Sequence, residues 1–142
     1  MNKSMKLTKE TEYALEGLAS LAKRPEGAVI AAADLADTVG TSVGFMSKIL
    51  QRLSGAKLTR GHRGNPRGYS LARPADRISV RDVVESLEGD DIFERCIFWS
   101  EPCSEANSCP LHDVWKRVRP QVRAQFSVLT MRDLARKKRK SG

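Results

Sequence analysis

The chain has 142 residues and a formal net charge of +8, from 25 Lys and Arg against 17 Asp and Glu. This length suits one domain, or a small domain with an appendage, and allows a core without disulfide staples. No apolar run approaches the ~18 residues that a transmembrane helix needs, and the first residues lack the apolar region of a signal peptide. We therefore expect a cytoplasmic protein with reduced thiols and no membrane partner, whose basic character favours a polyanionic one.

The charge is unevenly distributed along the chain. No Asp or Glu occurs between Thr38 and Ala75, a window that holds seven Lys and Arg residues. Between Asp82 and Glu105 the sign reverses, with eight acidic residues against Arg95 alone. We expect nucleic acid to meet the basic window and to avoid the acidic one.

The first third of the chain predicts three helices. Thr8 can cap a helix whose apolar residues recur at helical spacing. A shorter helix at 31–38 ends at Gly40, and Thr41 or Ser42 then caps a third. Two helices joined by a short turn with a glycine predict a helix-turn-helix unit.

A basic hairpin follows the third helix. The segments 58–61 and 69–72 predict short strands around the loop 62–68, which contains Arg63 and Arg67. A hairpin directly after a helix-turn-helix indicates a winged helix; the alternative is a solvated basic hairpin with no groove to enter. We predict a mainly α fold with a small β-wing, a winged helix-turn-helix followed by a long C-terminal dimerisation helix.

The predicted DNA contacts lie on the third helix and the wing. Small residues at a helix N-terminus can approach base edges, Lys and Arg neutralise phosphates, and arginine suits the minor groove. The candidates are Ser42, Gly44, Phe45, Ser47, Lys48 and Arg52 on the helix and Arg63 and Arg67 on the wing. The expected partner is a double-stranded DNA operator.

The C-terminal half predicts two further helices. Ser79 can cap a helix that ends at Gly89, and a long apolar stripe runs from Leu111 to Leu129. A small winged domain has too little core to cover that stripe, so we expect a second copy to cover it in a homodimer. Pro120 should kink this helix or break it.

These elements divide the chain into four predicted parts. They are a winged helix-turn-helix at 1–90, a cofactor-binding loop at 91–112, a dimerisation helix at 113–135 and a basic, disordered tail at 136–142.

All three cysteines lie within one short stretch. Cys96, Cys103 and Cys109 are separated by six and five residues, and His112 follows Cys109 by three. Soft thiolates select zinc or iron–sulphur iron. These gaps are wider than the paired spacing that zinc prefers and suit a cluster, whose irons are bound from several sides. A thiol or disulfide switch, a structural zinc site and inert buried cysteines are the alternatives.

Catalysis is a weaker hypothesis. No nucleophile–base–orienter arrangement is evident, and no Gly-rich cofactor loop opens a helix after a strand. We therefore expect neither an enzyme nor a small-molecule substrate.

In their order along the chain, these features resemble the Rrf-type winged-helix regulators, which include IscR, NsrR and RirA. The similarity runs from Met5 to about Leu134. Its motifs are Met5-Lys6-Leu7-Thr8 with Tyr13-Ala14-Leu15, the helix Ser42 to Leu53, the wing Arg63 to Tyr69, Asp82-Val83-Val84 with Leu87-Glu88-Gly89, and the three cysteines.

The resemblance implies a homodimeric transcription regulator whose operator binding depends on an iron–sulphur cluster, and we expect it to be a repressor. Iron supply, nitric oxide or redox change would alter the cluster bound by the three cysteines. The implied fourth ligand is His112, as in IscR-like members, or Glu12 of the other subunit, as in NsrR-like members. A cluster-free relative with a thiol switch or a protein partner, and a zinc-stabilised constitutive DNA binder, are the alternatives.

Three departures from the family pattern matter. The first cysteine gap is one residue longer than in IscR, so the cluster can be [2Fe-2S] or [4Fe-4S]. Arg67 stands in the wing where a glycine is common, and Pro120 lies in the dimer helix.

Overall fold

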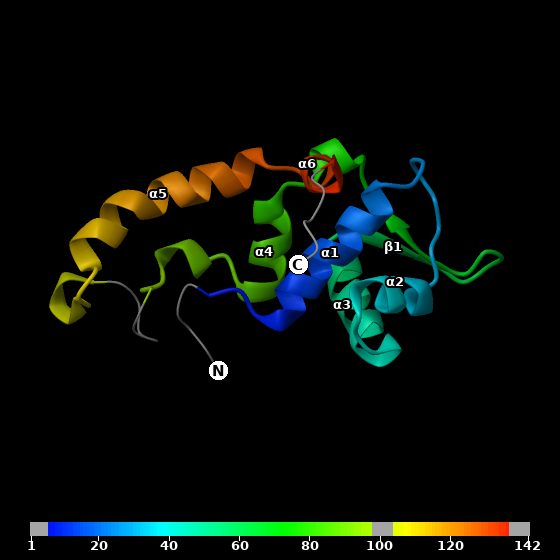
Figure 1. Ribbon diagram of the computed structural model, residues 1–142, viewed down its shortest axis with the longest axis horizontal. Coiled ribbons are helices and arrows are strands. Elements are labelled where there is room, and N and C mark those ends of the chain that lie inside the picture. The colour runs from blue at the N-terminus through cyan, green and yellow to red at the C-terminus, as the bar shows by residue number, and fades with distance from the viewer. Residues whose placement is uncertain (1–5, 98–103, 137–142) are drawn as a thin grey trace.

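The computed structural model describes residues 6–97 and 104–136 (Figure 1). The helices are α1 (Lys9–Ala22), α2 (Ala32–Val39), α3 (Val43–Gly55), α4 (Val80–Glu88), α5 (His112–Val128) and α6 (Met131–Arg136). The strands are β1 (Thr59–His62) and β2 (Gly68–Leu71), and the short 3-10 turns are η1 (Ala75–Arg77), η2 (Ile92–Glu94) and η3 (Glu105–Asn107). This mainly helical architecture with one small hairpin confirms the predicted fold class. In the described ranges, no helix is both long and apolar enough to cross a membrane.

The predicted helix starts are confirmed by their caps. The Thr8 hydroxyl accepts a hydrogen bond from the Thr11 amide, and Ser42 accepts one from Phe45. Ser79 forms a reciprocal capping box with Asp82. Such side chains satisfy backbone donors that have no partner within the first helical turn. The starts of α1, α3 and α4 are therefore determined largely by residues close together in the sequence.

The first four helices enclose one core. Its fully buried members come from the apolar faces that helical spacing predicts, and Ile78 and Met131 close it from the C-terminal side. The largest of the helical ones are Leu18, Leu35, Met46, Ile49, Leu50, Leu53, Val83 and Val84, and Leu58 and Ile92 join them from the segments that follow α3 and α4. This packing holds α3 rigidly against α1 and leaves its other face exposed.

The wing is an antiparallel hairpin attached to the segment before α2. The register pairs Thr59 with Leu71 and His62 with Gly68, one residue away from the predicted strand limits. Ile30 and Tyr69 exchange backbone hydrogen bonds of 2.9 Å in both directions. Gly68 has φ +152°, and a Cβ there would lie 2.3 Å from the Ile30 carbonyl oxygen, so only glycine lets the wing approach so closely.

The C-terminal half differs from the predicted single helix at 113–135. Leu129 is extended, so α5 ends at Val128, and Thr130 with Asp133 caps a separate helix, α6. Of the two outcomes predicted at Pro120, a kink or a break, the break is wrong, because α5 is continuous across it. Pro120 is exposed, where water can replace the missing helical hydrogen bond.

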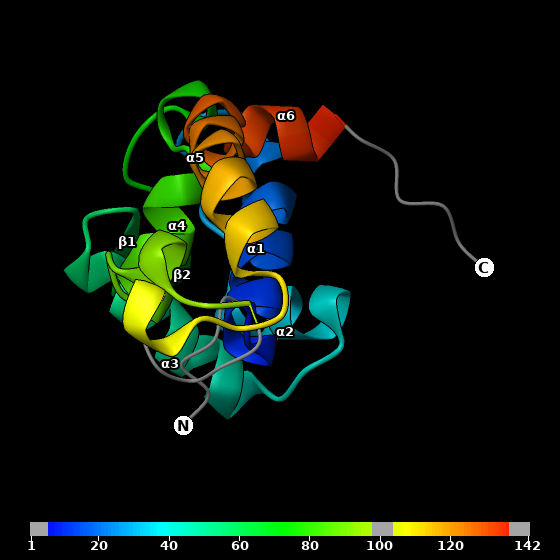
Figure 2. The ribbon, with the colours of Figure 1, turned by 90° about the vertical axis from the view of Figure 1, so that its left-hand side faces the viewer.

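Helix α5 reaches away from the winged domain, while α6 departs from its line and packs on α1 (Figures 1 and 2). The apolar stripe of α5 is therefore divided. Trp115, Val122 and Phe126 pack on the chain itself, Phe126 edge-to-face with Phe93 at 5.2 Å between ring centroids. An exposed set remains, which we call the α5 apolar face: Leu111, Val114, Val118 and Val128 at 37–69% exposure.

The predicted basic tail lies almost wholly outside the described residues, apart from Arg136, which ends α6.

Candidate nucleic-acid interface and cysteine site

The N-terminal half of α3 presents several of the residues predicted to contact DNA. Ser42 caps the helix, with its hydroxyl 3.1 Å from the Phe45 amide nitrogen. Gly44 and Lys48 are exposed, and Ser47 is half-buried beside them. These short side chains leave the start of α3 open to close approach by base edges, with a cation one turn further on.

Phe45 has a second role. Its half-buried ring packs edge-to-face on Tyr13, with the ring centroids 5.9 Å apart and the planes at 84°. The contact seats the start of α3 on α1. Only the exposed part of the ring remains for the predicted DNA contact.

A groove of about 730 Å³ lies between α3 and the wing. Its polar lining comes from Ser47, Gln51 and Ser54 of α3 and from His62, Arg63 and Arg67 of the hairpin. Both predicted wing arginines are exposed at this groove. His62 is held across the hairpin, with its Nε2 2.8 Å from the Ser70 hydroxyl.

Gln51 was missing from the predicted contacts. It lies four residues after Ser47, which places both on one face of the helix, and that spacing was a signal available in the sequence. A glutamine amide can donate to and accept from a base edge. Gln51 therefore joins the candidate DNA contacts.

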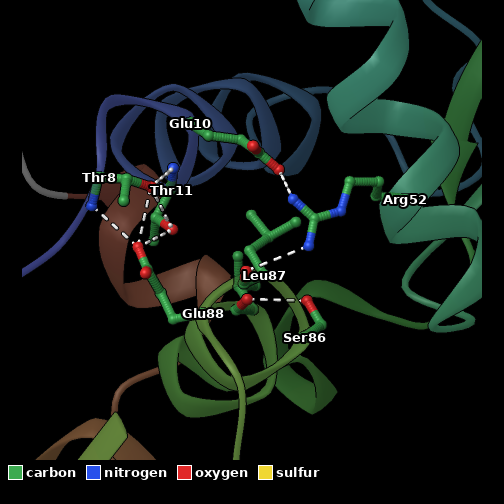
Figure 3. A network of polar contacts seen from close by, with 8 residues as sticks. Thr8, Glu10, Thr11, Arg52, Ser86, Leu87 and Glu88 are labelled. Carbon is green, nitrogen blue, oxygen red and sulfur yellow. Dashed lines mark hydrogen bonds and ion pairs between the residues drawn. The ribbon is translucent and has the colours of Figure 1, made fainter. Parts of the chain in front are cut away.

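Arg52, another predicted DNA contact, is bonded within the protein. Its guanidinium pairs with the Glu10 carboxylate of α1 and donates to the Leu87 carbonyl oxygen of α4 at 3.1 Å (Figure 3). The structure thus places this guanidinium between α1 and α4, and Arg52 is not among the residues that line the groove.

Two thiols and one imidazole of the cysteine segment are buried. Cys96 is 1% exposed, Cys109 6% and His112 6%, while Cys103 lies outside the described residues. Cys96 and Cys109 are not joined by a disulfide. The His112 amide donates to the Cys109 carbonyl at 3.0 Å, so these two residues share one turn at the start of α5.

Trp115 connects this turn to the first cysteine. Its indole nitrogen donates to the Arg95 carbonyl oxygen at 2.8 Å, and Arg95 directly precedes Cys96. The segment carrying Cys96 is thereby fixed against the first turn of α5, one turn from His112.

Glu105, between Cys103 and Cys109, contacts two residues at the start of α5. Glu105 lies 3.3 Å from His112 Nε2 through one oxygen and contacts the Lys116 ammonium through the other. The Lys116 hydrogen bond, and then that of His112, hold the pKa of Glu105 below its ordinary value. Glu12, the other candidate ligand, lies in the first turn of α1 and pairs with Lys9 at 3.0 Å.

By donor type, these residues fit an iron–sulphur cluster, which binds thiolates and in some cases imidazole. Among the residues that the structure describes, no group of three or more His, Cys, Asp or Glu is gathered closely enough to hold a metal ion. Cys96, Cys109 and His112 would therefore need Cys103, or a ligand from another chain, to complete a site.

A helix-turn-helix, a two-stranded wing and a groove between them define the class of winged-helix DNA-binding proteins. The Rrf2 family model, described as an iron-dependent transcriptional regulator, matches residues 7–137, and the chain belongs to this family. It is therefore a DNA-binding transcription regulator and not an enzyme.

Individual relatives agree with this assignment. A Mycobacterium tuberculosis protein named as an HTH-type transcriptional regulator is 33% identical over 131 residues, covering 92% of this chain and 81% of its own. The oxidized form of Staphylococcus aureus CymR is 27% identical, with a TM-score of 0.74, covering 95% of this chain and 99% of its own. IscR from T. potens, at 20% identity and a TM-score of 0.69 over 95% of this chain and 93% of its own, shares the fold.

Proposed function

We propose that this regulator, in the cytoplasm, controls operator binding through an iron–sulphur cluster held by Cys96, Cys103 and Cys109. The observation that carries the proposal is the burial of two thiols and an imidazole in a segment where Ser104, Glu105, Ala106, Ser108, Pro110 and Leu111 are all exposed. A folded segment has little reason to bury two thiols and an imidazole among exposed residues unless they bind something together. The bound cluster supplies sensitivity to iron supply, nitric oxide or redox change.

His112 is the fourth ligand that we favour over Glu12. Its position on the same turn as Cys109 and its burial support this choice, since a ligand must be held in place before the metal binds. Glu12 is exposed and ion-paired with Lys9, and it would reach a cluster only across a subunit boundary. Nothing in either arrangement selects [2Fe-2S] over [4Fe-4S].

The protein's own residues would connect the cluster to DNA. Trp115 fixes the Cys96 segment to α5, and the capped helices α1 and α4 carry that segment's position toward α3. A regulator of this kind would act as a repressor by occupying its operator in one cluster state.

A homodimer is part of the proposal. The α5 apolar face supports it, because four exposed apolar side chains on α5 and its N-cap residue are costly to leave in water. A two-fold dimer would present two α3 helices to successive major grooves, about 34 Å apart.

A thiol switch without a cluster is the second candidate. It is favoured by the presence of two thiols that are not bonded to one another and by the likeness to a CymR structure titled as an oxidized form. A structural zinc ion, in a protein that binds DNA constitutively, is a third.

The experiment measures iron, acid-labile sulphide and the visible spectrum of protein purified without oxygen. We expect iron and sulphide in near-equal amounts, lost in Cys103→Ala and retained in the matched control Ser108→Ala. Colourless, iron-free protein from anaerobic preparations would reject the cluster and leave the thiol switch. Zinc in stoichiometric amount would instead favour the structural ion.

A further inference from the structure

Arg52 occupies an unexpected position for a basic residue of a recognition helix. Its guanidinium is engaged twice within the protein, by the Glu10 carboxylate and by the Leu87 carbonyl oxygen (Figure 3). A guanidinium donates in a fixed planar fork, so the two partners together define its orientation. Moving the whole guanidinium to a phosphate would break these contacts.

The last turn of α4, which carries the Leu87 carbonyl group, is hydrogen-bonded to α1 and the residue before it. Glu88, next to Leu87, accepts three hydrogen bonds on one carboxylate oxygen: from the Thr8 amide at 2.8 Å, the Thr8 hydroxyl at 2.9 Å and the Thr11 hydroxyl at 2.6 Å (Figure 3). Thr11 is completely buried. The last turn of α4 therefore joins the start of α1 and, through Arg52, the recognition helix.

The same turn is bonded to the cysteine segment. Arg95, whose side chain is only 14% exposed, donates to the Glu88 carbonyl oxygen and pairs with Asp91 at 2.9 Å. Gly89 has φ +104°, and a Cβ there would lie 2.8 Å from an Asp91 carboxylate oxygen and 3.1 Å from Arg95 Nη2. The glycine thus makes room for Arg95 to close on α4.

We propose that Arg52 is a positioning residue that holds α3 to the last turn of α4, and that Arg95 transmits changes in the cysteine segment to it through that turn. The side chain that precedes Cys96 and the side chain on the recognition helix contact consecutive carbonyl groups, those of Glu88 and Leu87. A shift of Arg95 therefore acts on the anchor of α3. That a change in the bound cluster moves Arg95 rests on the proposed function, whereas the positioning of α3 by Arg52 does not.

Salt dependence separates positioning from direct binding to phosphate. Removing a cation that neutralises one phosphate lowers the slope of log K against log salt concentration by about 0.9. We expect Arg52→Met to weaken operator binding severalfold with an unchanged slope. Lys48→Met, the matched control one turn earlier on the same helix, should lower the slope by about 0.9 per protomer. An equal decrease of the slope in both variants would overturn the positioning role.

Glu10→Gln should change operator affinity in opposite directions under the two roles of Arg52. If Arg52 positions α3, removing its carboxylate partner loosens the helix, and operator affinity falls. If Arg52 binds phosphate, the substitution releases a competed guanidinium and removes a negative charge, and affinity rises. A rise would refute the proposal even if Arg52→Met were too unstable to measure.

Amide hydrogen exchange tests the path from Arg95. Arg95→Met should accelerate exchange in the first turn of α1 and in α3, although neither contains the substitution. Arg81→Met, the control, removes an ion pair with Glu85 on the same helix and should leave α3 unchanged. Exchange that changes only between residues 88 and 96 would reject the path.

These tests of Arg52 and Arg95 do not depend on whether the protein binds a cluster. Protein whose operator affinity is the same before and after removal of iron would reject cluster control. The exchange and salt measurements on the iron-free protein would still confirm or reject the role of Arg52.

Discussion

The indole N–H of Trp115 donates to the carbonyl oxygen of Arg95 at 2.8 Å. This one bond joins α5 to the residue before Cys96, and Trp115 is itself buried. The cysteine segment is thus held at both its ends, by Trp115 and by the turn that carries Cys109 and His112.

Replacing Trp115 with phenylalanine should release this segment while keeping an aromatic ring in place. The Arg95 carbonyl loses its donor, so we expect a loss of about 1–3 kcal/mol in the free energy of unfolding. Cys96 should also react faster with a thiol reagent. Urea denaturation and thiol titration measure the two effects. An unchanged rate of Cys96 modification would show that Trp115 does not hold the segment.

The base of the wing should not accept a side chain at Gly68. Gly68→Ala forces a Cβ against the Ile30 carbonyl at a positive φ, and we expect a destabilisation of about 2 kcal/mol with weaker operator binding. Gly64→Ala is the matched control in the same loop, because a Cβ there meets nothing within 4 Å. Equal thermal stability of the two variants would contradict the close approach of Ile30.

Arg63 tests the wing as a DNA contact. It is exposed at the groove beside α3, so Arg63→Ala should leave folding unchanged. Specific operator affinity should fall by about 1–3 kcal/mol if the side chain reads a groove. The measurement is a titration at one fixed salt concentration. Unchanged affinity would remove Arg63 from the interface.

Val118 tests the α5 apolar face. Val118→Asp places a charge among exposed apolar side chains, so the single chain should remain folded while the proposed dimer dissociates. Sedimentation velocity measures the change, and Arg117→Asp on the same turn is the control. A Val118→Asp protein that sediments as wild type would show that this face does not join two copies.

Much of the winged domain could be predicted because its signals are local. Thr8, Ser42 and Ser79 cap helices through residues three positions away. The division between α5 and α6 was equally local, since Thr130 and Asp133 have capping-box spacing. The apolar stripe that continues from α5 through Leu129 obscured this signal.

Contacts between distant residues could not be predicted in the same way. Arg52 and Glu10 are 42 residues apart, and only the packing of α1 on α3 brings them together. From the sequence alone, a basic residue on a recognition helix predicts a DNA contact and gives no sign of a partner on α1. Gln51, by contrast, could have been found from its spacing to Ser47.

The most direct test of the account is the operator affinity of one protein sample before and after its iron is removed anaerobically with a chelator, at one salt concentration. We expect specific affinity to change at least tenfold, while affinity for unrelated DNA stays the same. Cys103→Ala should bind the operator equally with and without this treatment. Equal operator affinity of the iron-loaded and iron-free wild-type protein would contradict control by a cluster.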